Sequence, residues 1–348
     1  MFNKTIKINK SISIGQKEKC FIIAEIGSNH NGNFKTALKL INEAKKAGAD
    51  AVKFQSFKAE KHFSKFSPGF KYLKNKPMYK LIKSLEINRS WHKKLIEYCS
   101  KKKIIFFSSP CDYDAVDELF ALGVKIFKIA SFDITDLDLV DYISKKKGVI
   151  ILSTGLANYE DIKLALSICK KNRNKNIILL QCTSLYPAPE NLINLTCIKT
   201  LSKKYKCITG FSDHTLGNEM AIASIPLGSK VLEKHFTLSK KMKGPDHKFA
   251  MEPKEFSIMV KSIRNVESGI GDGVKGKISK YEREMYKKGR RSLHYFRDIN
   301  KGEKLKEVDI ITKRPGLGIK PYKKKEILGL TLKKNVKKDQ WIKIQDLM

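Results

Sequence analysis

The chain has 348 residues, 41% of them hydrophobic, and its 70 Lys and Arg against 35 Asp and Glu give a formal charge of +35 at pH 7. This length suits one large barrel of ~250 residues with a small second domain. The basic residues are mostly lysines spread along the chain, without a nucleic-acid motif, so we expect no nucleic-acid binding. No uncharged apolar run approaches the ~18 residues of a membrane span, so we expect no membrane anchorage.

The seven cysteines are scattered along the chain, and no C-x-x-C pair occurs among them. This usage is typical of reduced thiols in a cytoplasmic protein. The lysines near the N-terminus precede no apolar segment, so the sequence predicts no export signal.

The elements expected in chain order begin with a hairpin over residues 5–14, where apolar and polar residues alternate. Helical periods follow, the first behind Asn33 as N-cap and the last from Pro253 to Gly269. Such helices alternate with near-continuous apolar strands, which predicts a parallel sheet, and eight repeats predict a closed (β/α)8 TIM barrel, an α/β fold. Functional residues are then expected at the carboxyl ends of the strands. The eight strands are expected over residues 20–26, 51–55, 104–108, 124–130, 149–154, 177–182, 206–210 and 230–235.

Two segments interrupt this rhythm. Residues 56–88 are too long for a simple connection and are rich in aromatic residues, which favours a lid. After a barrel domain over 1–272, Gly- and charge-rich residues 273–289 predict a linker, and short β-like stretches over 290–348 predict a small β-rich domain that needs another surface to pack on. The lid aromatics are Phe63, Phe66, Phe70, Tyr72 and Tyr79.

Two histidines end successive strand patterns, His214 in Gly210-Phe-Ser-Asp-His-Thr215 and His235 in Val231-Leu-Glu-Lys-His-Phe-Thr237. Their spacing is that of one strand and helix repeat, so a barrel places them side by side. Imidazole nitrogens suit Mn, Zn, Fe or Co, and two of them leave positions for water or substrate. The alternative, hydrogen bonding at a strand end, is less favoured because acidic residues flank both. The other histidines lack such a pairing, and we interpret His62, His92 and His294 as surface or packing residues and His30 and His247 as candidate supporting groups.

Two lysines lie inside apolar strands. The period of two places Lys53, with Gln55, and Lys128 inside the barrel. A buried ammonium needs an anionic partner. Glu25 is the structural partner available for one lysine, so two inward lysines suggest a cradle for a phosphate or carboxylate, together with Ser108, Ser109, Ser131 and Ser212 at other strand ends.

Two rigid turns add further candidates at the active face. Ser184 and Tyr186 lie in Cys182-Thr-Ser-Leu-Tyr-Pro-Ala-Pro189, where both reach toward substrate or the tyrosine simply packs on the prolines. Asp246 lies in Gly244-Pro-Asp-His247.

Seven motifs in order resemble the sialic acid synthase family over essentially the whole chain, and Lys313-Arg-Pro-Gly316 is similar to that family's antifreeze-like (SAF) domain. These enzymes condense phosphoenolpyruvate with an N-acetylated hexose to a nine-carbon 2-keto acid and release phosphate by C–O cleavage. The motifs are Ala24-Glu-Ile-Gly-x-Asn-His-Asn-Gly32, Val52-Lys-Phe-Gln55, Lys128-Ile-Ala-Ser131, Ser153-Thr-Gly155, Gly210-Phe-Ser-Asp-His-Thr215, Glu233-Lys-His-Phe-Thr237 and Gly244-Pro-Asp-His247.

The resemblance implies a role for each candidate residue. His214 and His235 would hold Mn²⁺, with Mg²⁺ or Co²⁺ as alternatives, to polarise the aldehyde of the open-chain sugar. Arg314 would reach the N-acetyl group from the other subunit of a domain-swapped homodimer. Phosphoenolpyruvate would be bound by Lys53, Lys128, Ser109, Ser131, Ser184 and Ser212; proton transfer or sugar hydroxyls would fall to Glu25, Glu233 and Asp246; and Gln55, Asp133 and Tyr186 would line the sugar pocket.

Departures from the family leave the sugar open between N-acetylmannosamine and a 2,4-diacetamido hexose. Ser184 stands where the family typically has Asn. Ser131-Phe-Asp133 replaces Ser-Gly-Glu and is closer to the Ser-Phe-Glu of pseudaminate synthases, which use a 2,4-diacetamido altrose, whereas Gly244-Pro-Asp-His247 favours the sialate and legionaminate branches.

Two other classes of protein account for the sequence less well. A related phosphoenolpyruvate-condensing synthase for a seven- or eight-carbon keto acid gives no reason for the SAF domain. A glycan- or nucleic-acid-binding protein with an inert barrel gives no reason for the strand-end histidines and lysines.

Overall fold

The structure is a computed structural model and describes residues 1–70, 73 and 76–348. Its described residues form two compact units, Met1–Ile270 and Gly271–Met348. Tyr72, one of the expected lid aromatics, lies outside the described residues. No helix in the described ranges is long and apolar enough to cross a membrane.

Eight parallel strands close into a barrel in the order β10-β3-β4-β5-β6-β7-β8-β9, which confirms the predicted TIM barrel. Strand β9 reaches Asp213, beyond the expected end at Gly210, so Ser212 belongs to the strand itself. The strands are β3 Phe21–Gly27, β4 Ala51–Ser56, β5 Ile105–Pro110, β6 Ile126–Ile129, β7 Val149–Ser153, β8 Ile177–Cys182, β9 Ile208–Asp213 and β10 Val231–His235.

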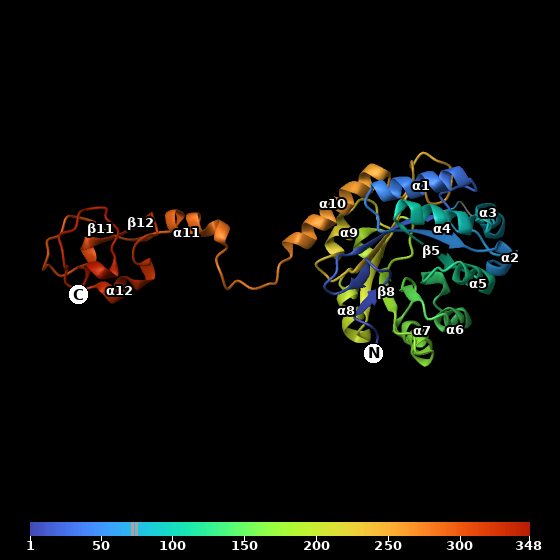
Figure 1. The fold of residues 1–348 in the computed structure, drawn as a ribbon, viewed down its shortest axis with the longest axis horizontal. Helices are drawn as coiled ribbons and strands as arrows, with labels where there is room; N and C mark the ends of the chain where they lie inside the picture. Colours follow the sequence, from blue (N-terminus) through green and yellow to red (C-terminus); the bar gives the residue numbers. More distant parts are fainter. Residues whose placement is uncertain (71–72, 74–75) are drawn as a thin grey trace. The chain divides into compact units, whose positions relative to one another are not determined.

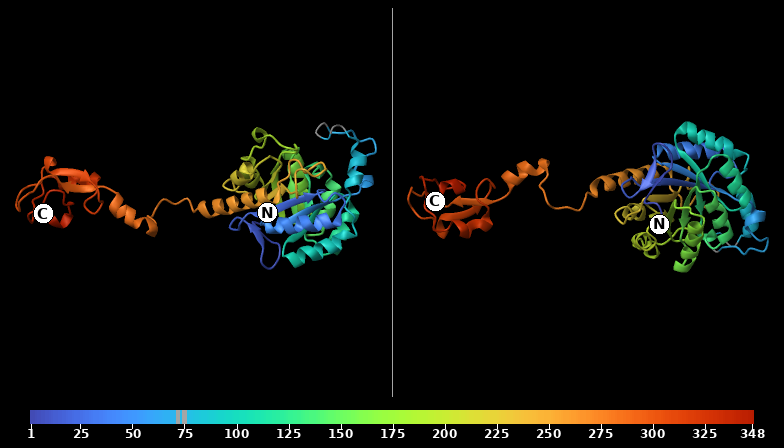
Figure 2. Two further views of the ribbon diagram at one scale, coloured as in Figure 1. Left: turned by 90° about the horizontal axis from the view of Figure 1, so that it is seen from above. Right: turned by 60° about the horizontal axis from the view of Figure 1, so that its bottom comes forward.

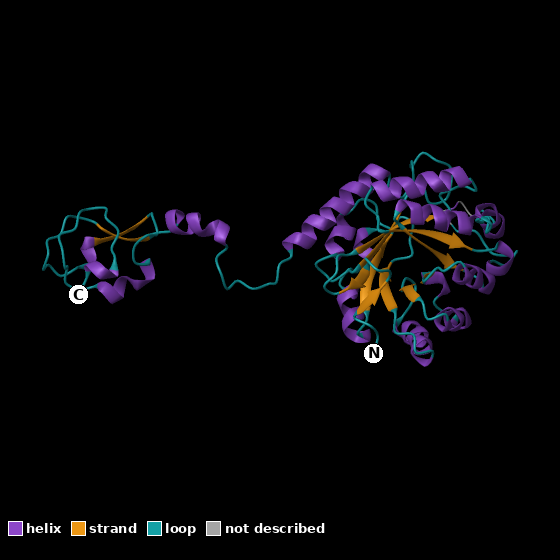
Figure 3. Ribbon diagram, viewed as in Figure 1, coloured by secondary structure: helices purple, strands orange, loops and turns teal. Residues whose placement is uncertain are grey.

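Helices surround the strands, as Figure 3 shows for the barrel unit. The first begins behind Asn33, whose side chain accepts a hydrogen bond from the Thr36 amide, as expected for an N-cap. The last runs from Pro253 to Gly269, as the sequence predicts. The surrounding helices are α1 Phe34–Lys46, α4 Trp91–Lys102, α5 Tyr113–Ala121, α6 Leu137–Lys145, α7 Tyr159–Lys171, α8 Cys197–Tyr205, α9 Glu219–Ser224 and α10 Pro253–Gly269.

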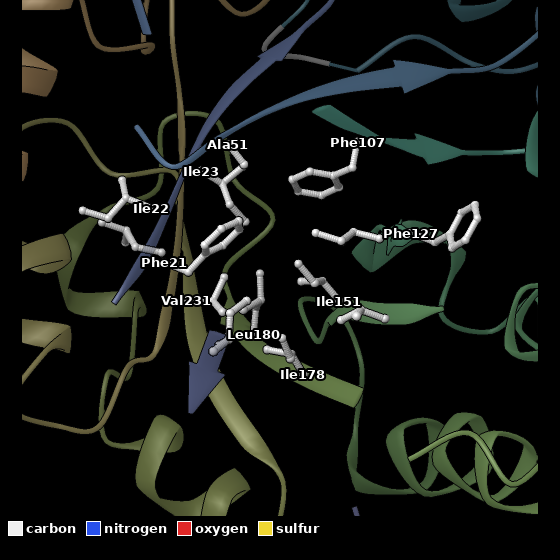
Figure 4. Close-up of a cluster of buried hydrophobic side chains, with 14 of the residues drawn as sticks. Phe21, Ile22, Ile23, Ala51, Phe107, Phe127, Ile151, Ile178, Leu180 and Val231 are labelled. Atoms are coloured by element: carbon white, nitrogen blue, oxygen red, sulfur yellow. The ribbon is translucent and has the colours of Figure 1, made fainter. Parts of the chain in front are cut away.

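Apolar side chains fill the barrel interior. Phe107, Ile151, Ile178, Leu180 and Val231 come from four different strands and point toward one another in Figure 4, and all are fully buried. Because this layer fills the interior, a ligand has access only at the strand ends.

The amino-terminal hairpin covers the end of the barrel at which the strands begin. Strands β1 Thr5–Lys7 and β2 Ser13–Gly15 pair antiparallel, as predicted. The Asn3 side chain donates to Asn176, next to the start of β8, so the hairpin lies at the end where the strands begin. The opposite end, where the strands finish, is left for the site.

In its described residues, the segment between β4 and α4 contains the α-helices α2 Ala59–His62 and α3 Met78–Leu85. They lie on the side toward which the β4 and β5 arrows point in Figure 1, and at the rim of the barrel unit in both views of Figure 2. Glu86 ties the segment's ends together, since it pairs with Lys58 at 2.8 Å and accepts the Ala59 amide at 2.8 Å. We call residues 57–86 the lid segment.

The second unit has a small hydrophobic core of its own, which includes Leu293, Tyr295, Leu332 and Ile342. Strands β11 Ser292–Tyr295 and β12 Ile310–Lys313 pair antiparallel. Within the β-rich domain expected over 290–348, residues 333–338 and 341–344 contribute isolated bridges and no named strand. Within the expected linker the chain forms η4 Lys280–Glu282 and α11 Arg283–Gly289, and α12 Lys324–Ile327 follows later.

Candidate active site at the strand ends

A cavity of about 570 Å³ opens at the carboxyl ends of the barrel strands. Its wall includes every predicted site residue except Ser108, Ser184 and Arg314. The Ser108 hydroxyl donates to the Phe54 carbonyl at 3.0 Å instead. The predicted residues present in the wall are Glu25, Lys53, Gln55, Ser109, Lys128, Ser131, Asp133, Tyr186, Ser212, His214, Glu233, His235 and Asp246.

Two lysines and two glutamates form a buried cluster at the cavity floor. Strand register brings them together, because Glu25 on β3 pairs with Lys53 on β4 on one side and with His235 on β10 on the other. Lys53 Nζ lies 3.0 Å from Glu25 and 3.6 Å from Glu233, and Lys128 Nζ lies 3.7 Å from Glu233.

The expectation that the protein has a partner for only one lysine is therefore wrong. Glu25 is the partner that the sequence indicates. Glu233, on strand β10 beside β3, also lies close to both ammonium groups. The contact with Lys128 is still beyond hydrogen-bond distance, so its donors stay available to a ligand.

The charges of this cluster do not cancel at neutral pH. Burial raises the pKa of Glu25 to about 7 although Lys53 opposes the shift. Burial also acts to raise the pKa of Glu233, but Lys128 and Lys53 outweigh it and hold that pKa below the usual value. With Glu25 partly protonated, Glu233 is the carboxylate of this cluster that stays charged, and burial lowers the pKa of Lys128. A bound anion would stabilise the charged form of that lysine, so the floor favours an anion.

The two predicted histidines lie side by side on the same wall, with ring centroids 5.4 Å apart. His214 Nδ1 donates to the Thr183 carbonyl at 2.8 Å, which leaves Nε2 for a ligand. His235 Nδ1 is buried without a hydrogen-bond partner and lies 3.8 Å from an Asp246 oxygen. The spacing predicted from one barrel repeat thus brings the two rings together.

The electrostatics of the two rings differ. Burial, followed by the electrostatic effect of His214, holds the pKa of His235 well below its usual value. A neutral ring suits a metal ligand. Burial also acts to lower the pKa of His214. Cys182, whose Sγ lies 3.9 Å away, and the Thr183 carbonyl act against burial, and the pKa of His214 is raised. A cation bound between the rings would oppose that protonation.

As a donor set the pair fits a catalytic metal better than a structural one. Among residues 1–70, 73 and 76–348, no group of three or more His, Cys, Asp or Glu side chains is arranged to hold an ion by itself. Two imidazoles and the nearby Asp246 carboxylate leave several positions for substrate and water. Protein ligands alone do not complete this site.

Serine hydroxyls line the wall beside the lysines. Ser131 Oγ accepts the Gly155 amide at 3.1 Å, and Gly155 is confined because an added Cβ would lie 2.4 Å from Ser184 Oγ. Ser184 therefore sits beside the cradle although it does not line the cavity. Its hydroxyl and that of Ser153 are buried without partners in the described structure. Ser153 ends β7 in a quoted motif, so the period of two would have identified it.

The other two predicted serines already have partners. Ser109 donates to the Lys128 carbonyl at 3.1 Å, and Ser212 donates to Glu233 at 3.2 Å. Their hydroxyls fix the positions of the strand carrying Lys128 and of the carboxylate between the lysines. A ligand contact by either would compete with these hydrogen bonds.

Tyr186 packs on the two histidines. Its ring centroid lies 4.3 Å from that of His214 and 6.1 Å from that of His235, and Phe249 closes the other side at 5.4 Å. Gln55, also predicted to line the sugar pocket, donates to Glu25 at 2.8 Å. Both residues therefore hold site groups in place as well as lining the cavity.

The lid segment supplies a wall that sequence reasoning did not assign in detail. His62, which the sequence led us to interpret as a surface or packing residue, packs on Phe57 and Phe63 and also lines the cavity. It ends the four-residue helix α2, which is too short to show a periodicity in the sequence that would indicate the direction of the side chain. The apolar part of this wall is formed by Phe57, Phe63, Phe70, Leu73, Met78, Leu81, Ile82 and Leu85.

The remaining histidines lie outside the cavity wall. His92 is fully buried and lies between Ser56 and Glu118, 2.9 Å from each. His247 bonds to Thr237 at 2.6 Å, and His30 packs edge-on against Trp91. These are packing and loop-stabilising residues.

Arg314 belongs to the second unit. Its side chain is exposed, and its Nε donates to the Gly289 carbonyl at 2.7 Å, which anchors the guanidinium group within that unit.

The NeuB family model matches residues 40–275, and the SAF domain model matches residues 290–348. The N,N'-diacetyllegionaminic acid synthase of Campylobacter jejuni is 43% identical over 94% of this chain and 99% of its own length. The pseudaminic acid synthase of the same organism is 35% identical over 92% of this chain and 94% of its own length.

A crystal structure of N-acetylneuraminic acid synthetase from Leptospira borgpetersenii, in complex with citrate, superimposes with a TM-score of 0.73. It is 35% identical, and the match covers 81% of this chain and 95% of that one. These matches agree with the barrel and with the second unit. The chain belongs to the NeuB family, the family of the sialic-type (nonulosonic) acid synthases, and carries a SAF domain at its carboxyl end.

Proposed function

We propose that this enzyme condenses phosphoenolpyruvate with an N-acetylated hexose, N-acetylmannosamine or a 2,4-diacetamido hexose, in the manner of its synthase relatives. The balanced reaction joins C3 of phosphoenolpyruvate to the aldehyde carbon, adds water at C2 and releases phosphate by C–O cleavage. The product is a nine-carbon 2-keto acid. A pseudaminate-type reaction on a 2,4-diacetamido altrose is the second candidate, favoured by Phe132 and Asp133 after Ser131.

The observation that carries the proposal is the convergence of buried cations and acids on one cavity. Lys53 and Lys128 give the cavity floor an excess of positive charge, which suits a phosphate and a carboxylate on one small molecule. The partnerless hydroxyls of Ser153 and Ser184, next to the Gly155 amide, add donors for the same anion.

His214 and His235 would hold a divalent cation, Mn²⁺ in this proposal with Mg²⁺ or Co²⁺ as alternatives. When bound, such an ion supplies a Lewis acid for the sugar aldehyde. Tyr186 and Phe249 pack on these rings and restrict their rotation, while Asp246 borders the same region from its rigid turn.

Glu25 is the group best suited to exchange a proton during the reaction. Its pKa of about 7 is close to neutral pH, where both protonation states are populated. It also lies against Lys53, which would orient it toward the bound anion. Glu233 stays charged and holds both lysines in place.

A domain-swapped homodimer belongs to this proposal. Four exposed apolar side chains each follow a barrel strand by three residues, Phe132 after β6, Leu156 after β7, Leu185 after β8 and Leu216 after β9. They therefore stand at the end of the barrel that carries the cavity. A second domain from a partner subunit would cover them and bring Arg314 to the sugar. A cytoplasmic location accords with the seven free cysteines.

Phosphate release tests the reaction. The protein with Mn²⁺ and phosphoenolpyruvate should release phosphate only after an N-acetylated hexose is added, and mass spectrometry should find one keto acid per phosphate. A panel of hexoses that includes the 2,4-diacetamido altrose identifies the sugar. If no sugar on the panel supports phosphate release above the rate without sugar, the proposal fails.

Arg314 tests the swapped dimer. Arg314→Ala should raise the KM for the sugar by roughly tenfold, because a charge-assisted hydrogen bond is lost, and leave the KM for phosphoenolpyruvate unchanged. Neighbouring Lys313→Ala, which removes only an ion pair with Asp339, is the matched control. A change confined to phosphoenolpyruvate would show that Arg314 does not act on the sugar.

A further inference from the structure

Two polar side chains face the lid side of the cavity with their hydrogen-bonding capacity unused. His62 ends α2 in the lid segment, and Asp133 lies in the turn η2 (Ser131–Asp133) after β6. Within the described ranges neither side chain makes a hydrogen bond or an ion pair of its own. By contrast, Glu25, Gln55 and Ser212 on the floor already bond to one another or to neighbours.

His62 is held by packing alone. Its ring stacks on Phe57 with centroids 6.3 Å apart and meets Phe63 edge-on at 4.9 Å. These contacts fix the ring plane and leave the ring nitrogens for a ligand. Such packing between aromatic rings gives the imidazole N–H a defined position without a hydrogen bond to the protein.

Asp133 lines the same cavity as His62. Burial raises the pKa of Asp133, and the groups that oppose this shift are His62 first and Lys128 next. The carboxylate is therefore within electrostatic reach of both the lid histidine and the catalytic floor. An acceptor from the barrel and a donor from the lid thus border one space.

Apolar side chains of α3 surround that space. Met78, Leu81, Ile82 and Leu85 all line the cavity and belong to one amphipathic helix. Hexose hydroxyls alone would gain nothing from such a wall, whereas a methyl group would be removed from water there.

We propose that His62 and Asp133 are specificity-determining residues that bind a second acylamino group of the sugar, on the carbon chain away from the aldehyde. An amide offers one carbonyl acceptor and one N–H donor, which match an imidazole N–H and a carboxylate. Its acetyl methyl then packs on α3. The sugar class selected is a 2,4-diacetamido hexose over a 2-acetamido hexose with a hydroxyl at C4.

This inference rests on the proposed function, because the amide is placed on the sugar of that reaction. The experiment compares kcat/KM for the two sugars at saturating phosphoenolpyruvate, in the wild-type protein and in variants. The wild type should prefer the 2,4-diacetamido hexose. His62→Phe keeps the stacking surface and removes both nitrogens, so that preference should fall by roughly 10- to 100-fold, through the KM for the diacetamido sugar.

Two variants separate recognition from a general effect on the lid. His62→Asn restores an N–H donor and should recover part of the lost preference. Asp133→Asn, nearly equal in size, exchanges an acceptor for an amide and should also reduce the preference. The control is Phe66→Ser, in the same segment but 95% exposed and outside the cavity wall, which should leave the preference unchanged.

The outcomes distinguish this inference from the proposed function. Phosphate release with either sugar upholds the function. If the preference of His62→Phe then stays within about threefold of the wild type, or if both sugars lose activity equally, the specificity role is overturned. Absence of release with every sugar in the wild type overturns both proposals.

Discussion

The two sides of the cavity solve the problem of buried polarity in opposite ways. On the strand-end side, Lys53, Lys128, Glu25 and Glu233 satisfy much of one another's charge within a rigid sheet. On the lid side, His62 rests on aromatic rings and faces an apolar helix. The first side is organised by the fold before any ligand arrives, whereas the second offers shape and unused hydrogen-bonding groups.

This difference separates the groups proposed for catalysis from those proposed to select the sugar. Groups that must keep a charge or a proton in a set position are on strands, where backbone register fixes them to their neighbours. Groups that meet the variable part of the substrate are on a segment that substitution can alter without disturbing the barrel. Changes on the strand-end side should therefore affect catalysis and stability together, and changes on the lid side should affect sugar choice.

The largest expected effect is at the histidine pair. His235→Ala should reduce phosphate release by roughly 10³-fold or more, because the proposed metal loses one of its two imidazole ligands. The variant should retain its fold, since the side chain lies at a strand end, outside the filled interior. Metal content by elemental analysis and far-UV circular dichroism would be measured alongside activity.

His247→Gln is the matched control. His247 lies in the loop after β10, outside the cavity wall, and its ring bonds to Thr237. We expect this variant to keep its metal. An active, metal-containing His235→Ala protein would show that the metal assignment is wrong.

Glu25 should give the strand-end side a distinctive pH dependence. Burial raises its pKa from the ordinary 4.5 to about 7, so between these pH values the folded state holds a proton that the unfolded state has lost. Stability then falls as pH rises through this window. Glu25→Gln should remove that fall, which is on the order of 1–3 kcal/mol. Denaturant unfolding of metal-free protein at several pH values measures it.

Asp246 has a raised pKa of about 6 and contributes a fall of the same sign, but it is present in both proteins. The difference between wild type and variant therefore isolates Glu25. Identical slopes in the two proteins would mean that Glu25 is not shifted, and the excess positive charge of the floor would have to be abandoned.

The strand-end side was predictable from sequence, and the lid side was not. A period of two decides whether a strand residue points inward, and the common barrel end decides which residues meet, so Lys53, Lys128, His214 and His235 were located correctly. Pairing between side chains was harder, because Glu233 reaches both lysines across strands in a way that linear patterns do not record. For His62 the four-residue helix α2 is too short for a sequence pattern to indicate a direction.

We expect a substitution at Ser184 to have opposite effects on stability and on ligand binding. Its buried hydroxyl has no partner among the described residues, so Ser184→Ala should leave stability unchanged or raise it by less than about 1 kcal/mol. The same change should raise the KM for phosphoenolpyruvate by roughly 3- to 10-fold if the hydroxyl awaits that ligand. Thermal unfolding and initial rates supply the two measurements. A loss of stability without a KM change would make Ser184 a packing residue only.

The smallest effect should come from the charged pair on the lid side. Lys61 on α2 pairs with Asp114 on α5, and both side chains are substantially exposed, 43% and 65%. Water and salt screen such a pair, so Lys61→Met, Asp114→Asn and the double variant should each shift Tm by less than about 2 °C. The same cycle on Lys53 and Glu25 should show strong coupling, because neither buried charge can be solvated when its partner is removed. Comparable coupling in the two cycles would remove the distinction between a prearranged floor and an adaptable lid.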